Sequence, residues 1–174
     1  MKYYRFIKLA LFLVVGVLIG VYHTFMVENL KYTLPTIMIF YGVEAIAFAI
    51  YYSRKKCYLE YRLYWGHVEI LLGLLVLTNV EDFSTICIVW AIWAILREAW
   101  ETKVAVSNLR DLVPSIIELT AGLANVIFSI LMIMNPNEHH ATIHLYLLIV
   151  ELGVASILPI VRYYVYHIDE YAVK

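Results

Sequence analysis

The most regular feature of this sequence is the alternation of long apolar runs with shorter polar separators. Six apolar segments occur, at roughly 6–27, 33–53, 63–80, 83–102, 112–134 and 141–163. Each is close to the ~20 residues that an α-helix needs to cross a bilayer. Residues 9–27 form too long a run for a signal peptide, and no A-x-A cleavage site follows. The pattern therefore predicts an all-α membrane protein with six transmembrane helices, including a retained first helix.

The separators between these segments differ in length and charge. Those at 28–32, 79–82 and 135–140 are short, acidic or neutral, and contain the turn formers Asn or Pro. The linkers at 53–62 and 103–111 are longer and basic. If successive helices alternate in direction, all 13 Lys and Arg residues except Lys31 fall on one side of the membrane. The positive-inside rule then predicts that the N- and C-termini are both cytoplasmic.

Shifting the chain against itself indicates an internal repeat. At an offset of 56, WGHVEILLGLLVLTN (65–79) lies over AGLANVIFSILMIMN (121–135), and Asn79 meets Asn135. At an offset of 50, Asn29 meets Asn79. Because all copies have the same orientation, these are parallel repeats and not inverted pairs of the kind found in many transporters. We predict one membrane domain, 1–174, of three tandem parallel helical hairpins at approximately 6–53, 63–102 and 112–163.

Composition and charge narrow the class of protein. With 63% hydrophobic and 16% charged residues and a mean hydropathy of +0.79, the chain is too apolar for a soluble domain, which makes the lipid bilayer its expected partner. A net charge of −1 gives no support for nucleic-acid binding. The two cysteines, Cys57 and Cys87, suit neither a disulfide framework nor a metal knuckle.

The pattern resembles the HdeD-like acid-resistance membrane proteins, small bacterial proteins built from a repeated two-helix domain. The likeness lies in the glycine-containing helix that ends in an Asn-Pro turn, Gly122 to Asn135-Pro136, and in a second apolar helix that ends in a basic cluster. The run AIWAIL at 91–96 is similar to the core of the family's second helix. This chain departs from the pattern with 7 glycines and 15 tyrosines, and it lacks Pro after Asn29 and Asn79. The resemblance implies a role in acid or envelope stress in the bacterial cytoplasmic (inner) membrane, and it supplies no catalytic residues.

Ionisable residues inside the apolar segments are the first candidate site. A carboxylate in hydrocarbon costs about 2.5–3.5 kcal/mol on insertion scales, so these residues are expected to face the bundle or to be protonated. Arg97 has three alternative partners, Glu69, Glu101 and Glu118, or it extends to the cytoplasmic interface. In the repeat alignment, Ile95 and not Glu98 matches Glu151, which leaves open whether the carboxylates form one cluster or separate helix–helix hydrogen bonds. The candidate buried proton or polar sites are Glu44, Glu69, Glu98, Glu151 and Arg97.

A second group of titratable residues is predicted on the opposite, outer side. Histidine titrates near pH 6.5 and carboxylates titrate near 4, so this face is a candidate for pH sensing, with ordinary polar loops as the alternative. His140 and His144 are spaced i,i+4 and share a helix face, but no third fixed ligand is evident for a metal. The candidate pH-sensing residues are His139, His140, His144 and Glu138.

The remaining motifs indicate packing more than chemistry. Gly16-x-x-x-Gly20 allows close approach of a neighbouring helix, either within the subunit or in a homo-oligomer. No phosphate-binding loop, HExxH, CxxC or Ser/His/Asp order is present, so the sequence predicts no enzyme activity, cofactor or metal site. Two functions are favoured: a non-enzymatic stress-resistance membrane protein, or a small proton-linked transporter or channel that uses Glu44 and Glu151. An intramembrane enzyme is a third hypothesis, and it would need a polar cavity open to one leaflet. The sequence does not identify a small-molecule substrate.

Overall fold

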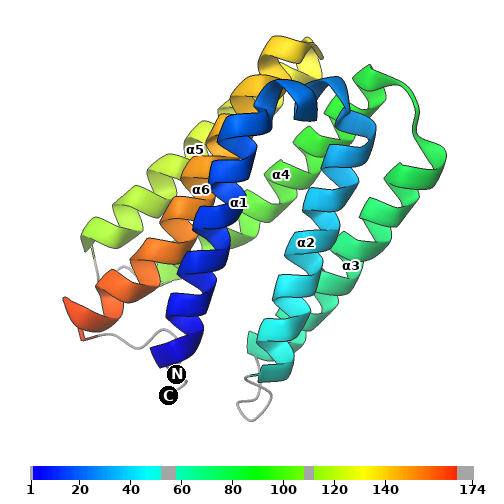
Figure 1. The fold of residues 1–174 in the computed structure, drawn as a ribbon. Helices are drawn as coiled ribbons and strands as arrows, with labels where there is room; N and C mark the ends of the chain where they lie inside the picture. Colours follow the sequence, from blue (N-terminus) through cyan, green and yellow to red (C-terminus); the bar gives the residue numbers. More distant parts are fainter. Residues whose placement is uncertain (1, 52–57, 108–111, 168–174) are drawn as a thin grey trace. The chain divides into compact units, whose positions relative to one another are not determined.

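The computed structural model describes residues 2–51, 58–107 and 112–167 as six helices (Figure 1). Each predicted apolar segment corresponds to one helix. Five of the helices extend beyond a predicted limit by three residues or more, because tyrosine, threonine, histidine and charged residues continue the helix past the apolar run. The helices are α1 (Lys2–Glu28), α2 (Leu30–Tyr51), α3 (Tyr58–Asn79), α4 (Phe83–Ser107), α5 (Leu112–Met134) and α6 (Glu138–Tyr164).

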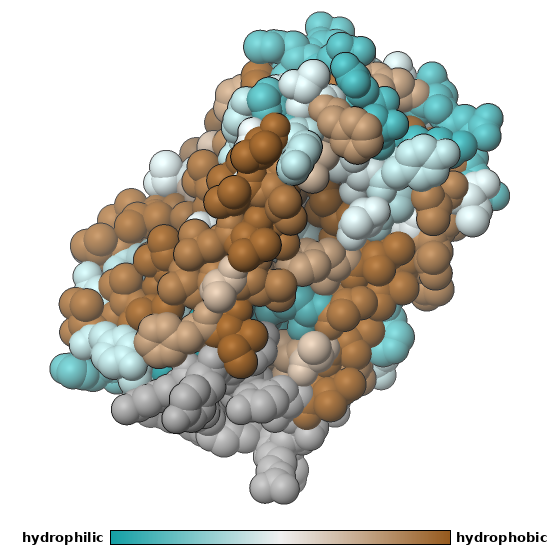
Figure 2. All heavy atoms as spheres, viewed as in Figure 1, coloured by the Kyte–Doolittle hydropathy of each residue, from teal (hydrophilic) through white to brown (hydrophobic). Residues whose placement is uncertain are grey.

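Most of these helices have the length and composition of membrane spans. Within the described ranges, five of them, α1, α2, α4, α5 and α6, are long and apolar enough to cross a bilayer. α3 is not among them, because Arg62, His67 and Glu69 lower the hydropathy of its first half. Large apolar side chains are exposed along the helices, for example Val17 and Leu71, and Figure 2 shows hydrophobic atoms on the helix flanks and hydrophilic atoms mainly at helix ends. Such surfaces indicate contact with lipid.

The chain divides into two compact units. The four-helix unit, residues 1–27 and 87–174, contains α1, nearly all of α4, α5 and α6. The hairpin unit, residues 28–86, contains α2, α3 and the first turn of α4. The limits of the units fall inside the first two predicted repeats. The threefold repeat therefore remains a prediction from the sequence.

In the hairpin unit, α2 and α3 run antiparallel and very close together. A Cβ atom built on Gly42 would lie 2.5 Å from the carbonyl oxygen of Gly66, so only the absence of side chains allows this approach. Near one end, Gly73 is placed in the same way against the carbonyl oxygen of Pro35, at 3.0 Å. Near the other end, the guanidinium of Arg62 lies 4.4 Å from the centroid of the Phe48 ring. The contact thus extends over most of both helices.

In the four-helix unit, α1 lies antiparallel beside α6 (Figure 1). Cβ atoms built on Gly16 and Gly20 would each lie 3.7 Å from the side chain of Ile149, which is ordinary packing distance. The Gly-x-x-x-Gly pattern therefore faces a helix of the same subunit. Towards the start of α1, Arg5 lies 4.1 Å from the centroid of the Tyr163 ring. These contacts fix the register of α1 on α6.

The short turns are held by side-chain caps. Asp82 precedes α4, and its Oδ2 accepts hydrogen bonds from the backbone N–H of Thr85 at 2.8 Å and from the Thr85 hydroxyl at 2.9 Å. The backbone hydrogen bond from Thr85 is the main cause that lowers the pKa of Asp82 below its ordinary value. Asn137 caps α6 by accepting from the backbone N–H of His140 at 2.9 Å. The turn predicted at 28–32 is shorter in the structure: Asn29 alone separates α1 from α2.

Candidate functional site

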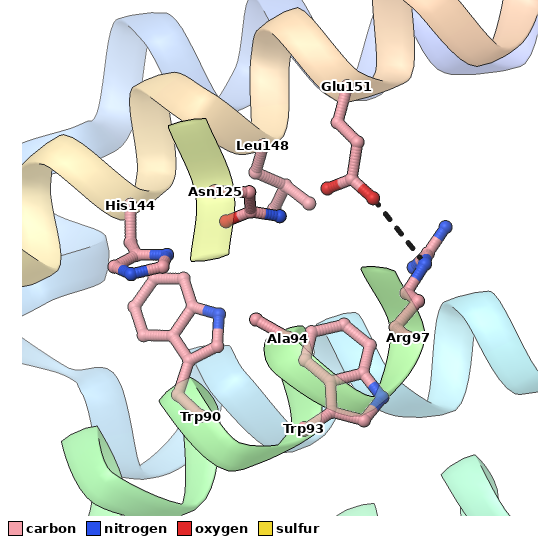
Figure 3. Close-up of a pocket in the computed structure, with 8 residues that line it drawn as sticks. All are labelled: Trp90, Trp93, Ala94, Arg97, Asn125, His144, Leu148 and Glu151. Carbon is pink, nitrogen blue, oxygen red and sulfur yellow. Dashed lines mark ion pairs between the residues drawn. The ribbon is translucent and has the colours of Figure 1, made fainter. Parts of the chain in front are cut away.

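An ion pair joins the middle of α4 to the middle of α6. The Nε atom of Arg97 lies 3.5 Å from Oε1 of Glu151, and the two side chains are only 14% and 19% exposed. Figure 3 shows the two side chains pointing towards each other from facing helices. Arg97 therefore pairs with a residue outside the three alternatives predicted from the sequence, and its low exposure argues against extension to the interface. The guanidinium also lies 5.6 Å from the centroid of the Trp93 ring.

Glu98, the next residue on α4, is buried against α5. Its Oε1 accepts a hydrogen bond from Nδ2 of Asn125 at 2.9 Å, and the residue is 4% exposed. Gly122, one turn before Asn125, makes room for the carboxyl group, since a Cβ atom there would lie 2.6 Å from Oε2 of Glu98. α5 thus provides both a donor and a space for one carboxyl group.

The two carboxyl groups are also close to each other. The carboxyl group of Glu98 lies near that of Glu151, and the charges of the two groups interact. Two neighbouring carboxyl groups favour a state in which one of them is protonated, because two like charges repel each other. We call Arg97, Glu98, Asn125 and Glu151 the polar cluster. It contains one fixed positive charge and two carboxyl groups, so one bound proton makes it neutral.

A small cavity adjoins the polar cluster. Its volume is about 10 Å³, which is close to the space of one water molecule. Two tryptophans form one side of it and residues of α5 and α6 form the other (Figure 3). The cavity is too small for a continuous aqueous path. Its lining residues are Trp90, Trp93, Ala94, Arg97, Asn125, His144, Leu148 and Glu151.

His144 is part of this interior and not of an exposed face. The residue is 2% exposed, and its ring centroid lies 5.4 Å from that of Trp90. Its Nε2 has no hydrogen-bond partner among the residues that the structure describes. The prediction that grouped His144 with the outer residues is therefore corrected: the i,i+4 spacing with His140 holds, but His144 lies one turn deeper, where Trp90 covers it.

The other candidate outer residues remain accessible at the start of α6. Glu138 and His139 are exposed in the first turn. His140 is half-buried, and its Nδ1 lies 2.8 Å from the carbonyl oxygen of Asn135. Groups of three or more His, Cys, Asp or Glu side chains that would hold a metal ion do not occur in the described parts of the chain.

A second ion pair joins α5 and α6 nearer the C-terminal end of α6. Arg162 donates two parallel hydrogen bonds to Glu118, from Nη1 to Oε1 at 2.7 Å and from Nη2 to Oε2 at 2.6 Å. Arg162 is only 7% exposed. Glu118 was predicted as an alternative partner of Arg97, and the structure pairs it with Arg162 instead. Sequence separation gives no indication of the pairing, because it depends on how α5 and α6 align.

Three of the five predicted intramembrane residues, Arg97, Glu98 and Glu151, come together in the polar cluster. Glu44 and Glu69 belong to the hairpin unit, where Glu69 is buried and Glu44 half-buried, and both make polar or electrostatic contacts. Asn125 is the member that the sequence analysis missed. An amide in the middle of the apolar run at 112–134 was the available signal.

Fold and site together define a multi-pass helical membrane protein with a buried polar cluster between α4, α5 and α6. Comparisons with protein-family models, curated proteins and solved structures gave no match. The resemblance to HdeD-like proteins therefore rests on the pattern of helices and turns alone.

Proposed function

We propose that this chain is a non-enzymatic membrane protein that acts in acid or envelope stress in the cytoplasmic membrane of a bacterium. The polar cluster is its proton-responsive part. The observation that carries the proposal is the juxtaposition of two carboxyl groups, Glu98 and Glu151, with a single arginine, Arg97, in a nearly dry interior.

The proposed topology has six crossings, with both termini in the cytoplasm. α3 is included because it packs along most of α2, from Gly73 against Pro35 to Arg62 over Phe48. If α2 spans the bilayer, a helix in such close antiparallel contact crosses with it. Within α3, Glu69 is buried and Arg62 is half-buried, so protein contacts shield both residues from lipid. His67 is exposed, and its Nδ1 lies 2.7 Å from the carbonyl oxygen of Leu63 in the same helix. The concentration of Lys and Arg on one side supports the orientation.

Proton binding would act through packing. Without a proton, the polar cluster carries one negative charge in excess, and an uncompensated charge near the bilayer centre costs about 2.5–3.5 kcal/mol on insertion scales. With one proton the cluster is neutral, and the repulsion between the charges of Glu98 and Glu151 is removed. The three helices that contribute these residues therefore have different preferred packing in the two states. The exposed His139 and the half-buried His140 would add a response on the other side.

The test is survival of an acid challenge. A strain without the gene is complemented with the natural chain, with Glu151→Gln, or with Glu138→Gln, and protein levels in the membrane are compared by immunoblot. We expect the Glu151→Gln strain to resemble the deletion, because glutamine fixes the cluster in one charge state. Glu138→Gln changes an exposed residue on the same helix and is expected to retain function. Equal survival with and without the gene would exclude the stress role.

A proton-linked transporter or channel is the alternative function. The observation in its favour is that Glu151 lines both the small interior cavity and a groove on the outside of α5 and α6. It predicts a pH-driven flux in liposomes that Glu151→Gln abolishes, with Glu44→Gln as the test of the hairpin unit. Absence of flux with the natural chain would exclude it.

A further inference from the structure

A groove lies on the surface of the four-helix unit between α5 and α6. Its volume is about 410 Å³, which lies within the usual range of about 300–1,000 Å³ for small-molecule sites. Its walls are apolar and include Ile116, Ile117, Leu147 and Val150. Several of these side chains are about half exposed, so the groove opens to the membrane and not to the interior of the bundle.

Two polar residues break this apolar lining. Asn125 and Glu151, both members of the polar cluster, also line the groove. Thr120 is present as well, but its hydroxyl donates to the carbonyl oxygen of Ile116 in the same helix at 2.8 Å. The Glu151 side chain remains 19% exposed although it pairs with Arg97. A molecule in the groove would therefore meet hydrocarbon on most sides and a carboxyl group at one point.

The charge near Glu151 determines which molecule suits the groove. Among the described residues, the charged groups that act on Glu151 are Arg97, Glu98 and Glu101, all on α4. From α5 the neighbouring residue is the uncharged Asn125, while Glu118 is bound to Arg162. α1 packs against α6 through Gly16 and Gly20. Glu101 is exposed, so Arg97 is the cation that faces the carboxyl groups of Glu98 and Glu151. When both carboxyl groups are ionised, the three residues have a net charge of −1, which one additional positive charge would neutralise.

We propose that the groove binds an apolar monovalent cation, which reaches it from the bilayer and replaces the proton of the polar cluster at Glu151. This inference rests on the proton-responsive cluster of the proposed function but is independent of the stress role. Apolar walls suit an organic cation whose charge is shielded by hydrocarbon or aromatic groups. A hydrated metal ion would not find the polar partners that it needs there.

Binding of tetraphenylphosphonium to the purified full-length chain in detergent tests the proposal. Equilibrium dialysis is carried out between pH 5 and 8, and proton release is followed in weak buffer with an indicator dye. Because cation and proton compete for one site, we expect the affinity to rise by about tenfold per pH unit in the competing range, with about one proton released per cation. Tetraphenylborate, which has the same shape and the opposite charge, is expected not to bind.

Two variants separate the carboxyl group from the groove. Glu151→Gln is expected to weaken tetraphenylphosphonium binding by more than about tenfold, because the charge partner is lost in a medium of low dielectric. Val150→Trp fills the groove without altering the polar cluster, and it is expected to block binding while the helical circular dichroism is unchanged. Glu138→Gln, on the same helix but outside the groove, is expected to bind normally.

Several results would overturn the proposal. The first is that the natural chain does not bind tetraphenylphosphonium, and the second is that it binds this cation equally well at every pH. The third is that tetraphenylborate binds equally well, and the fourth is that neither Glu151→Gln nor Val150→Trp weakens binding of the cation. Equal binding of both ions would mean that the groove holds only apolar material such as lipid chains. If acid survival still depends on Glu151, such results reject the cation site and leave the proposed function standing.

Discussion

Asn125 holds Glu98 across the interface between α5 and α4, with 2.9 Å between the amide nitrogen and the carboxyl oxygen. Both residues are buried, and the same amide lies at the edge of the groove that contains Glu151. The Asn125 side chain therefore bonds the polar cluster inside the bundle and also lines the groove on the outer surface of α5 and α6. The arrangement makes Asn125 the most informative position for testing the polar cluster.

Asn125→Ala is expected to lower the free energy of unfolding by about 1 kcal/mol, the usual size of an interhelical hydrogen bond in membranes. The reason is the loss of the only donor that α5 offers to Glu98 among the described hydrogen bonds. Reversible unfolding in mixed micelles, followed by circular dichroism, measures the change. Thr120→Ala is the control, because that hydroxyl bonds only within its own helix. An Asn125 variant as stable as the control would contradict the assigned role.

Gly122→Ala is expected to disturb the polar cluster. The added methyl group would lie 2.6 Å from Oε2 of Glu98, so the carboxyl group must move away from Asn125. We expect a loss of about 1–2 kcal/mol, within the range for overpacking. Gly153→Ala, on α6, is the matched control, because nothing lies within 4 Å of a Cβ atom there. Its stability should be unchanged or higher by up to about 1 kcal/mol through helix propensity. Similar effects of the two changes would exclude a specific role for Gly122.

Gly42→Ala is expected to separate α2 from α3. Its methyl group would lie 2.5 Å from the backbone oxygen of Gly66, and backbone cannot move aside as a flexible side chain can. A loss of roughly 1–3 kcal/mol follows from overpacking. Gly16→Ala serves as the control, since its nearest neighbour, Ile149, lies 3.7 Å away. Proteolysis of the full chain in micelles reports on opening of the hairpin unit. Equal protease resistance of the two variants would refute the close approach.

Replacing Arg162 by Met is expected to destabilise the contact between α5 and α6 by about 3 kcal/mol, because Glu118 would lose a buried bidentate partner. The double variant Arg162→Met with Glu118→Leu should recover much of this loss, since no unpaired charge remains. Thermal unfolding of all four chains of the double-mutant cycle gives the coupling free energy. Simple additivity of the two changes would show that the ion pair contributes nothing.

The cap at Asp82 predicts a dependence of stability on pH. Its pKa is lowered in the folded chain, chiefly by the hydrogen bond from the backbone of Thr85. The contribution is therefore complete above the ordinary carboxyl pKa of about 4 and is lost as the pH falls through the lowered value. Asp82→Asn keeps a capping oxygen but does not titrate, so it should remove this pH dependence and retain the cap. Unfolding measured from pH 2 to 6 checks this, and an unchanged pH profile in Asp82→Asn would contradict it.

The positions of the helices could be predicted from the sequence because each apolar run is long and the separators are distinct. The Asn79–Asp82 turn, for example, matches the break between α3 and α4. Partner choice could not be predicted. Arg97 had several acidic residues within reach on a helical diagram, and only the packing of α4 on α6 selects Glu151. The repeat alignment placed Glu98 one turn away from the position that matches Glu151. The two side chains still meet, because they lie on different helices whose relative height the alignment does not specify.

The division of the chain at Val27 and Cys87 has a consequence for biosynthesis. α1 packs on α6, the last of the six helices in chain order, with Gly16 and Gly20 against Ile149. The hairpin of α2 and α3 is complete in the chain before α4 is finished. We therefore expect α2 and α3 to associate as they leave the ribosome, while α1 remains in the membrane without its partner until α6 has been made. Of the six helices, the first to be made is thus the one whose partner is made last.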